Sequence, residues 1–138
     1  MWTCGPKGTL AEWDILFVDG KIEQVAPDIT VPQGSAVVIE GAGKHITPGL
    51  IDCHSHSAAS SINEGTQYIT SEVRMRDVID PNDINIYRQL GGGLTTANVL
   101  HGSANPIGGQ NVVIKLRWGS NANELIFKNA PELSLIHI

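Results

Sequence analysis

Hydrophobic and polar positions in the first third of the chain are grouped as short strands would group them. Residues 14–26 form two β-rich runs joined by Asp19-Gly20. This dipeptide is a strong hairpin signal, because a type I′ turn needs positive φ at both central positions. A further apolar run covers residues 36–40 and is followed by glycines and a proline. The pattern predicts small antiparallel strands up to about Thr47.

A more continuous apolar run follows and ends in histidines. It lies within residues 45–57 and finishes at His54-x-His56. We expect a buried strand here, in which successive side chains alternate between the two faces. His54, His56 and Asp52 should then share one side, while Cys53 and Ser55 point away. Two imidazoles on one side of a strand form a metal-ligand arrangement, although a His-x-His pair also occurs by chance.

The next part of the pattern changes from helix to strand. Asp80 is predicted to cap a helix, with Pro81 at its first position and Asp83 in its first turn. Three glycines at 91–93 should end the helix, and residues 94–100 read as a second strand. The predicted apolar stripe of this helix comprises Ile84, Ile86, Tyr87 and Leu90. Strand, helix and strand in this order predict the repeating unit of a parallel barrel.

A glycine-rich loop at 101–110 is predicted directly after the second strand. Loops at the carboxyl ends of barrel strands build active sites, so His101, Asn105 and Gln110 are candidates for substrate contacts. A plain turn with solvated polar side chains remains the alternative. The glycines lack the spacing of a dinucleotide or phosphate-binding loop. Residues 111–118 are a candidate further strand, and we expect surface charges from its Lys and Arg.

Composition excludes several classes of function. The formal net charge is −5, from 9 basic and 14 acidic residues, which argues against a nucleic-acid surface. No apolar stretch approaches a transmembrane span, and no basic run suggests membrane attachment. Cys4 and Cys53 are too few for a disulfide framework. We expect Cys53 to serve packing.

The sequence Pro48-Gly49-Leu50-Ile51-Asp52-Cys53-His54-Ser55-His56 resembles the first barrel strand of the amidohydrolase superfamily. These metal-dependent hydrolases and deaminases include imidazolonepropionase, dihydroorotase, hydantoinase and isoaspartyl dipeptidase. A second stretch, 108–119, is similar to an imidazolonepropionase-like branch. The resemblance implies a mixed α/β fold, in which N-terminal β-sandwich strands of a composite domain (1–47) precede the first β/α units of a truncated (β/α)8 TIM barrel (48–132).

The resemblance also implies a chemistry. His54 and His56 would be first-strand ligands of a divalent metal, most simply Zn²⁺, as one or two ions. The superfamily takes a bridging Lys or Glu, two further His and a proton-accepting Asp from later strands. Too few residues follow His54 for a barrel of about 250 residues. We therefore expect an N-terminal fragment with no catalytic residue of its own, the Asp lying beyond its C-terminus, catalytically silent alone and binding metal weakly.

The implied reaction of the full-length parent is hydrolysis of carbon–nitrogen bonds other than peptide bonds, on a small-molecule substrate, without nucleic acid or membrane. A deaminase of the same superfamily and a non-catalytic orphan fragment or binding module are the alternatives. The substrate, the metal and its nuclearity stay open. A homo-oligomer of the parent stays open too, and exposed strand edges predict self-association of the fragment.

Both ends of the sequence carry expectations of their own. Relatives usually begin with several strand residues before the equivalent of Trp2, so Met1 is interpreted as an internal or misassigned start. Localisation is therefore left open, with the cytoplasm as the default and export still allowed. Residues 133–138 match one reading frame of a transposase mosaic-end sequence used in sequencing libraries. We expect an adapter-derived tail there, in which His137 has no functional weight.

Overall fold

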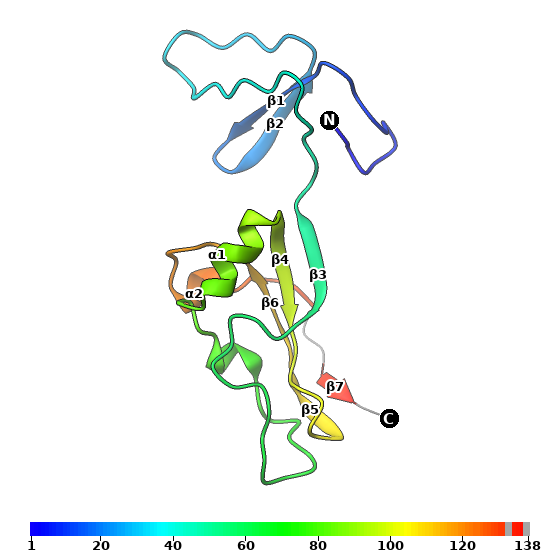
Figure 1. Ribbon diagram of the computed structural model, residues 1–138, viewed down its shortest axis with the longest axis vertical. Helices are drawn as coiled ribbons and strands as arrows, with labels where there is room; N and C mark the ends of the chain where they lie inside the picture. Colours follow the sequence, from blue (N-terminus) through cyan, green and yellow to red (C-terminus); the bar gives the residue numbers. More distant parts are fainter. Residues whose placement is uncertain (132–133, 137–138) are drawn as a thin grey trace. The chain divides into compact units, whose positions relative to one another are not determined.

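The computed structural model describes residues 1–131 and the backbone of residues 134–136. Its contacts separate two compact units, Met1–Pro48 and a second unit that begins at Gly49. The first unit contains one two-stranded sheet, and the second contains a three-stranded and a two-stranded sheet (Figure 1). Helices and strands both occur in the second unit, so the prediction of a mixed α/β fold is confirmed.

The first unit contains the predicted hairpin. Strands β1 (Asp14–Val18) and β2 (Lys21–Ala26) pair antiparallel, with Val18 opposite Lys21. Asp19 has φ of 49° and Gly20 has φ of 73°. Both turn residues thus adopt the left-handed conformation that a type I′ turn requires. The Asp-Gly signal is confirmed.

The further strand expected at residues 36–40 is absent, so that prediction is wrong. No described residue pairs with this segment, because β1 and β2 pair only with each other in a two-stranded sheet. Val37, Val38 and Ile39 are 91%, 77% and 83% exposed. Apolar composition favours a strand only where a neighbouring backbone supplies hydrogen bonds, and here that neighbour is missing.

The second unit is organised around a three-stranded sheet in the order β3 (Leu50–Ser55), β4 (Leu94–Val99) and β6 (Val112–Lys115). Strands β3 and β4 are parallel, and helix α1 (Ile84–Gly91) lies between them in the chain. This confirms the predicted strand, helix and strand. The further strand predicted within 111–118 is also present as β6, but it runs antiparallel to β4.

Short elements complete this unit. They are a 3₁₀ helix, η1 (Met75–Val78), a one-turn helix, α2 (Ala122–Leu125), and strands β5 (Ile107–Gln110) and β7 (Ser134–Ile136). Residues 107–110 were expected in a loop, but they pair antiparallel with β7 and bridge to Ile69 and Arg74. The tail predicted at 133–138 falls partly on β7, and its residues 133, 137 and 138 lie outside the described residues.

Helix α1 begins three residues later than predicted. Asp83, and not Asp80, is the N-cap: its Oδ1 accepts a hydrogen bond from the Asn85 N–H at 2.9 Å. The Oδ2 atom of Asp83 accepts another from the Ala58 N–H at 2.7 Å. The Asp80 carboxylate instead accepts from the Asn82 N–H, which closes a turn before the helix. Gly93 follows the helix with φ of 88°, as the glycine run predicts.

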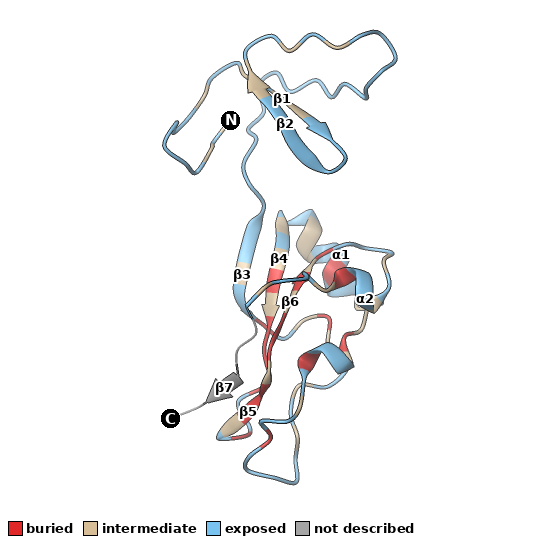
Figure 2. Cartoon of the chain, turned by 180° about the vertical axis from the view of Figure 1, so that it is seen from behind, coloured by how far each residue is buried: buried red, intermediate tan, exposed pale blue. Residues whose placement is uncertain are grey.

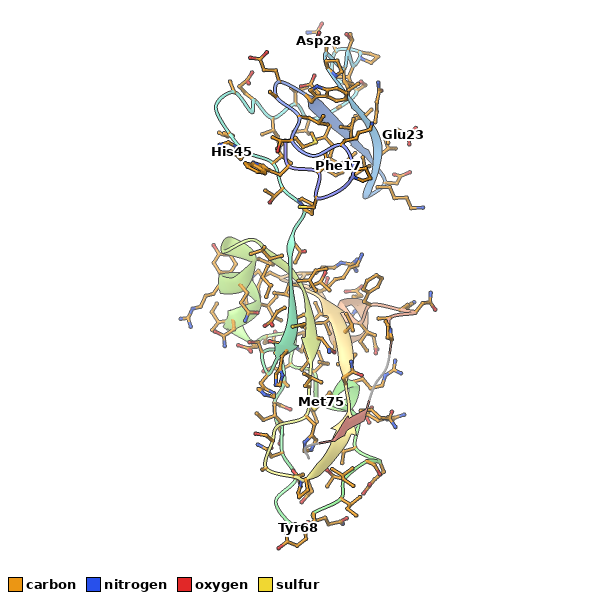
Figure 3. The ribbon with its side chains drawn as sticks, turned by 90° about the vertical axis from the view of Figure 1, so that its right-hand side faces the viewer. Phe17, Glu23, Asp28, His45, Tyr68 and Met75 are labelled. Carbon is orange, nitrogen blue, oxygen red and sulfur yellow. The ribbon has the colours of Figure 1, made fainter. Side chains whose placement is uncertain are left out.

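Buried apolar side chains gather on β4, β6 and the elements packed against them. The core comprises Ala58, Met75, Ile79, Ile86, Ala97, Val99, Val112, Ile114, Leu116 and Leu125. Met75 on η1 is fully buried in this cluster, and it is labelled in Figure 3. Of the predicted stripe on α1 only Ile86 is fully buried, whereas Ile84 and Tyr87 are 45% and 60% exposed.

Strand β3 is not the buried strand that its sequence predicts. Leu50 and Ile51 are 62% and 72% exposed, and most of β3 is coloured as exposed in Figure 2, in contrast to β4 and β6. The reason is topological, since β3 is an edge strand of the sheet and has a neighbour on one side only. Within the described part of the chain, no helix is long and apolar enough to cross a membrane.

Candidate metal-binding site

The carboxyl end of β3 brings two imidazoles together. The ring centroids of His54 and His56 lie 5.2 Å apart, with the planes at 83° to each other. Both residues are exposed, whereas Ser55 between them is buried. The two histidines therefore share the open side of the strand, as side-chain alternation predicts for this pair.

A β-bulge interrupts the alternation just before the pair. Asp52 is opposite Ala97 and Ser55 is opposite Val99, so three steps along β3 match two steps along β4. Asp52 thus aligns with the buried side of β4 and does not share the histidine side by simple alternation, contrary to expectation. Its carboxylate instead accepts a hydrogen bond from the His54 N–H at 3.0 Å. Bulges commonly re-aim a side chain beside a functional site.

The His56 ring is oriented by the backbone at the end of β4. Its Nδ1 lies 2.9 Å from the Leu100 carbonyl oxygen. A carbonyl can only accept, so Nδ1 carries a proton, and a neutral His56 ring that makes this bond has an unprotonated Nε2. The Leu100 N–H donates to the Ser55 carbonyl at 2.9 Å, which holds the same two segments together. Histidines that bind metals commonly donate their second nitrogen in this way.

His101 is placed in the interior of the second unit. It is 1% exposed, and its Nδ1 donates to the Gly102 carbonyl at 2.8 Å. Its Nε2 is buried without a hydrogen-bond partner among the described residues. Its burial gives a substrate no direct access in this conformation.

Asn105 and Gln110 occupy different settings. The Asn105 side-chain amide donates to the carbonyls of Glu64 and Gln67, both at 2.7 Å, and accepts from the Glu64 N–H at 3.3 Å. These bonds brace the preceding loop, and Asn105 is only 2% exposed. Gln110 lies half-buried on β5, where its backbone N–H donates to the Val73 carbonyl at 2.7 Å. Neither residue lies in the histidine pair's strand.

Glu64 is an acidic residue of this loop that sequence reasoning did not single out. Its carboxylate accepts from the Thr66 hydroxyl at 2.6 Å and from the Thr66 N–H at 2.9 Å. These two hydrogen bonds favour the charged form and hold the pKa of Glu64 below its usual range, with a smaller contribution from His101. A Glu two residues before a Thr in a polar loop is a weak sequence signal.

Two asparagines near the pair were also missed. The Asn98 side-chain amide on β4 donates to the Cys53 carbonyl at 3.3 Å, and the Asn111 amide donates to the Asn98 side-chain oxygen. Asn111 is buried and Asn98 is half-buried. The available signal was an Asn between two apolar residues, Ala97 and Val99, since buried polar side chains need partners.

The histidine pair has the chemistry of two metal ligands. Neutral imidazoles suit zinc and related divalent ions, and the fixed tautomer of His56 fits that use. A catalytic zinc usually takes three protein ligands. Among residues 1–131, no group of three or more His, Cys, Asp or Glu side chains is placed to hold a metal. The donors fit a metal, and at least one further ligand is required.

Several known proteins are similar to this chain. No family model matches the chain. An amidohydrolase of Hapsidospora irregularis is 34% identical in an alignment of 133 positions, which covers 88% of this chain and 13% of that protein. An imidazolonepropionase of Klebsiella pneumoniae is 41% identical and a dihydroorotase of Mycobacterium tuberculosis is 39% identical, each over 51 residues, or 37% of this chain and 12% of the relative.

A solved structure is similar as well. The crystal structure of an amidohydrolase from Thermotoga maritima matches with a TM-score of 0.76 and 36% sequence identity, covering 83% of this chain and 32% of that one. The chain thus spans about an eighth of the curated relatives and a third of the solved structure. Sequence and structural similarity agree with the motif at the end of β3: the chain belongs to the amidohydrolase superfamily.

Proposed function

We propose that His54 and His56 are the first-strand metal ligands of an amidohydrolase that hydrolyses carbon–nitrogen bonds other than peptide bonds in a small molecule. The observation that carries this proposal is the exposed imidazole pair, with ring centroids 5.2 Å apart and His56 fixed through Nδ1 by the Leu100 carbonyl. The superfamily membership supplies the reaction class. We propose zinc, as one or two ions, because neutral imidazole is a common zinc ligand in proteins.

The proposed architecture follows from the same membership. Residues of the first unit would contribute strands to a composite β-sandwich, and the second unit would begin a (β/α)8 barrel. The parallel pairing of β3 and β4 around α1 supports the barrel assignment. In that fold the carboxyl ends of the strands carry the active site, which is where His54 and His56 lie.

The chain's own residues would prepare the site in three ways. His56 keeps its proton on Nδ1, so that Nε2 is free to bind. The His54 ring lies beside the His56 ring, with the centroids 5.2 Å apart, in the segment where β3 bulges. The exposure of both rings leaves the site open to a substrate. The metal, when bound, would lower the pKa of a bound water and polarise the scissile group.

The remaining ligands and the proton-accepting Asp would come from sequence that follows these strands in a longer protein. Deamination is the alternative chemistry within the superfamily. The names of the similar proteins favour hydrolysis, since they include an amidohydrolase, an imidazolonepropionase and a dihydroorotase. A non-catalytic binding module is the alternative from a different class.

The test is a double substitution, His54→Ala with His56→Ala, in a protein that contains this sequence together with the later barrel strands. Metal content and hydrolysis of a panel of amides, cyclic amides and aminated heterocycles are measured. We expect loss of bound metal and of hydrolysis, and release of ammonia from the heterocycles by the unsubstituted protein would indicate deamination instead. His45→Ala, in the first unit, is the control. Unchanged metal content and activity in the double variant would refute the proposal.

A further inference from the structure

The Asn98 side chain on β4 lies beside the β3 bulge, where the regular backbone pairing of the two strands is interrupted. In the register of the two strands, Asp52 and Ser55 have partners in β4, whereas Cys53 and His54 have none. The Asn98 amide lies at this gap and donates to the Cys53 carbonyl at 3.3 Å. A side-chain donor thus binds the peptide that links Cys53 to His54, at the point where the backbone ladder is interrupted.

The orientation of the Asn98 amide is itself determined. Its oxygen accepts a hydrogen bond from the Asn111 amide, so its nitrogen must be the atom that faces Cys53. Asn111 is 4% exposed and precedes β6, the neighbour of β4 on the other side. The three-stranded sheet therefore contains a row of polar contacts that runs from Asn111 through Asn98 to the Cys53 carbonyl.

Asn98 also lies on the appropriate side of the sheet. Its neighbours Ala97 and Val99 are buried in the core, so Asn98 is directed to the opposite side by alternation. Ser55 is opposite Val99 and is buried on the core side, whereas His54 and His56 are exposed on the other. Asn98 and the two imidazoles thus belong to the same side of the β3–β4 pair.

We propose that Asn98, oriented by Asn111, is a positioning residue that holds the His54 peptide in the bulge and thereby keeps the His54 ring beside His56. The two histidines are then fixed by two different contacts. The His56 ring binds the carbonyl of Leu100, which directly follows β4, and the backbone carbonyl before His54 binds the Asn98 amide on β4. This inference rests on the proposed function for the role of the two histidines as metal ligands. The contacts of Asn98 with Cys53 and Asn111 are independent of that role.

The test compares Asn98→Asp with Thr96→Val in this chain. Asp has the shape of Asn and still accepts from Asn111, but its carboxylate cannot donate to the Cys53 carbonyl. Thr96→Val is a matched change two residues earlier on the same strand. Circular dichroism melting identifies folded variants. Two NMR readouts follow: the nuclear Overhauser contact between the His54 and His56 rings without metal, and the imidazole shifts during titration with Zn²⁺.

In Asn98→Asp we expect loss of the ring–ring contact and Zn²⁺ binding that is weaker about tenfold, the size typical of lost support for a ligand. Thr96→Val should retain both. A folded Asn98→Asp with the contact and the affinity of the unsubstituted chain would overturn the inference, as would absence of the contact in the unsubstituted chain. If Asn98→Asp does not fold, Asn98→Ala is judged by the same two readouts.

The ring–ring contact measured without metal tests this inference independently of the proposed function. If the unsubstituted chain shows the ring–ring contact but neither imidazole responds to Zn²⁺, the proposal of a metal site fails for this chain. The positioning role is then decided by the contact alone. If Zn²⁺ shifts both rings equally in Asn98→Asp and in the unsubstituted chain, the metal site stands and the role of Asn98 is refuted.

Discussion

Asn105 shows how a single side chain organises the loop that precedes the helix. Its amide binds two carbonyls and one N–H of residues 64–67 while it is itself buried. Leaving such backbone groups without a partner costs about 1–3 kcal/mol each. The residue was a candidate for substrate contact because it follows a predicted barrel strand, yet its side-chain amide forms its hydrogen bonds within the protein. Sequence position alone does not separate these two roles.

Glu64 in the same loop allows a prediction about pH. The Thr66 hydroxyl gives the largest contribution to the lowered pKa of Glu64. Thr66→Val, which removes that hydroxyl, should raise the pKa toward its usual range. Because the folded-state pKa is lowered, the interaction stabilises the fold above the pKa of the unfolded chain, and this contribution is lost as pH falls through the folded value.

The measurement is a carbon-13 NMR titration of the Glu64 carboxyl in the unsubstituted chain and in Thr66→Val. Thr95→Val, on β4, is the control and should leave the Glu64 titration unchanged. A midpoint in Thr66→Val equal to that of the unsubstituted chain would show that the Thr66 hydroxyl does not stabilise the carboxylate in solution.

The helices and strands differ in how far their structure is predictable from their own residues. The hairpin of β1 and β2 was predictable because Asp19 and Gly20 determine the turn locally. The bulge at Cys53 was not, because it depends on the register with β4, more than forty residues away in the chain. The antiparallel direction of β6 was not predictable either, because the hydrophobic pattern of a strand does not indicate whether it runs parallel or antiparallel to its neighbour.

The same distinction applies to the site. The His54 and His56 pair was visible in the sequence, since side chains two apart on a strand share a face. Asn98 and Asn111 were not, because their role arises only when three strands lie side by side. Hydrogen-bond partners that are distant in sequence determine which polar side chains bind within the protein and which are available to a ligand.

The start of α1 gives a quantitative prediction at this scale. Asp83→Ala removes both the N-cap bond to Asn85 and the bond to the Ala58 N–H. Loss of a cap lowers the free energy of unfolding by about 0.5–2 kcal/mol, and the loss of two bonds at Asp83 places its effect in the upper part of that range. Asp80→Ala removes only a turn contact with Asn82, for which we expect about 0.5 kcal/mol or less. Urea denaturation followed by circular dichroism measures both, and equal effects would contradict Asp83 as the cap.

At the scale of the whole molecule, apolar surface without a partner is the dominant feature. Val37, Val38 and Ile39 are exposed in the first unit, and Leu50 and Ile51 are exposed on the edge strand of the second. A soluble domain normally covers such side chains or breaks them up with charge, because an open strand edge can pair with another chain. Each unit by itself therefore offers a surface for self-association.

We expect the chain to self-associate, and we expect charges on these surfaces to reduce the association. Ile51→Lys places a charge on the β3 edge, and Val38→Lys places one in the exposed segment of the first unit, where no described strand is disturbed. Tyr68→Lys is the matched control, since Tyr68 is 82% exposed but lies in a loop outside any strand. Sedimentation velocity over a concentration series gives the association state of each variant.

Association reduced by Ile51→Lys but not by Val38→Lys would assign it to the strand edge, and the reverse would assign it to the first unit. A sharply monomeric unsubstituted chain at all concentrations would show that neither surface associates.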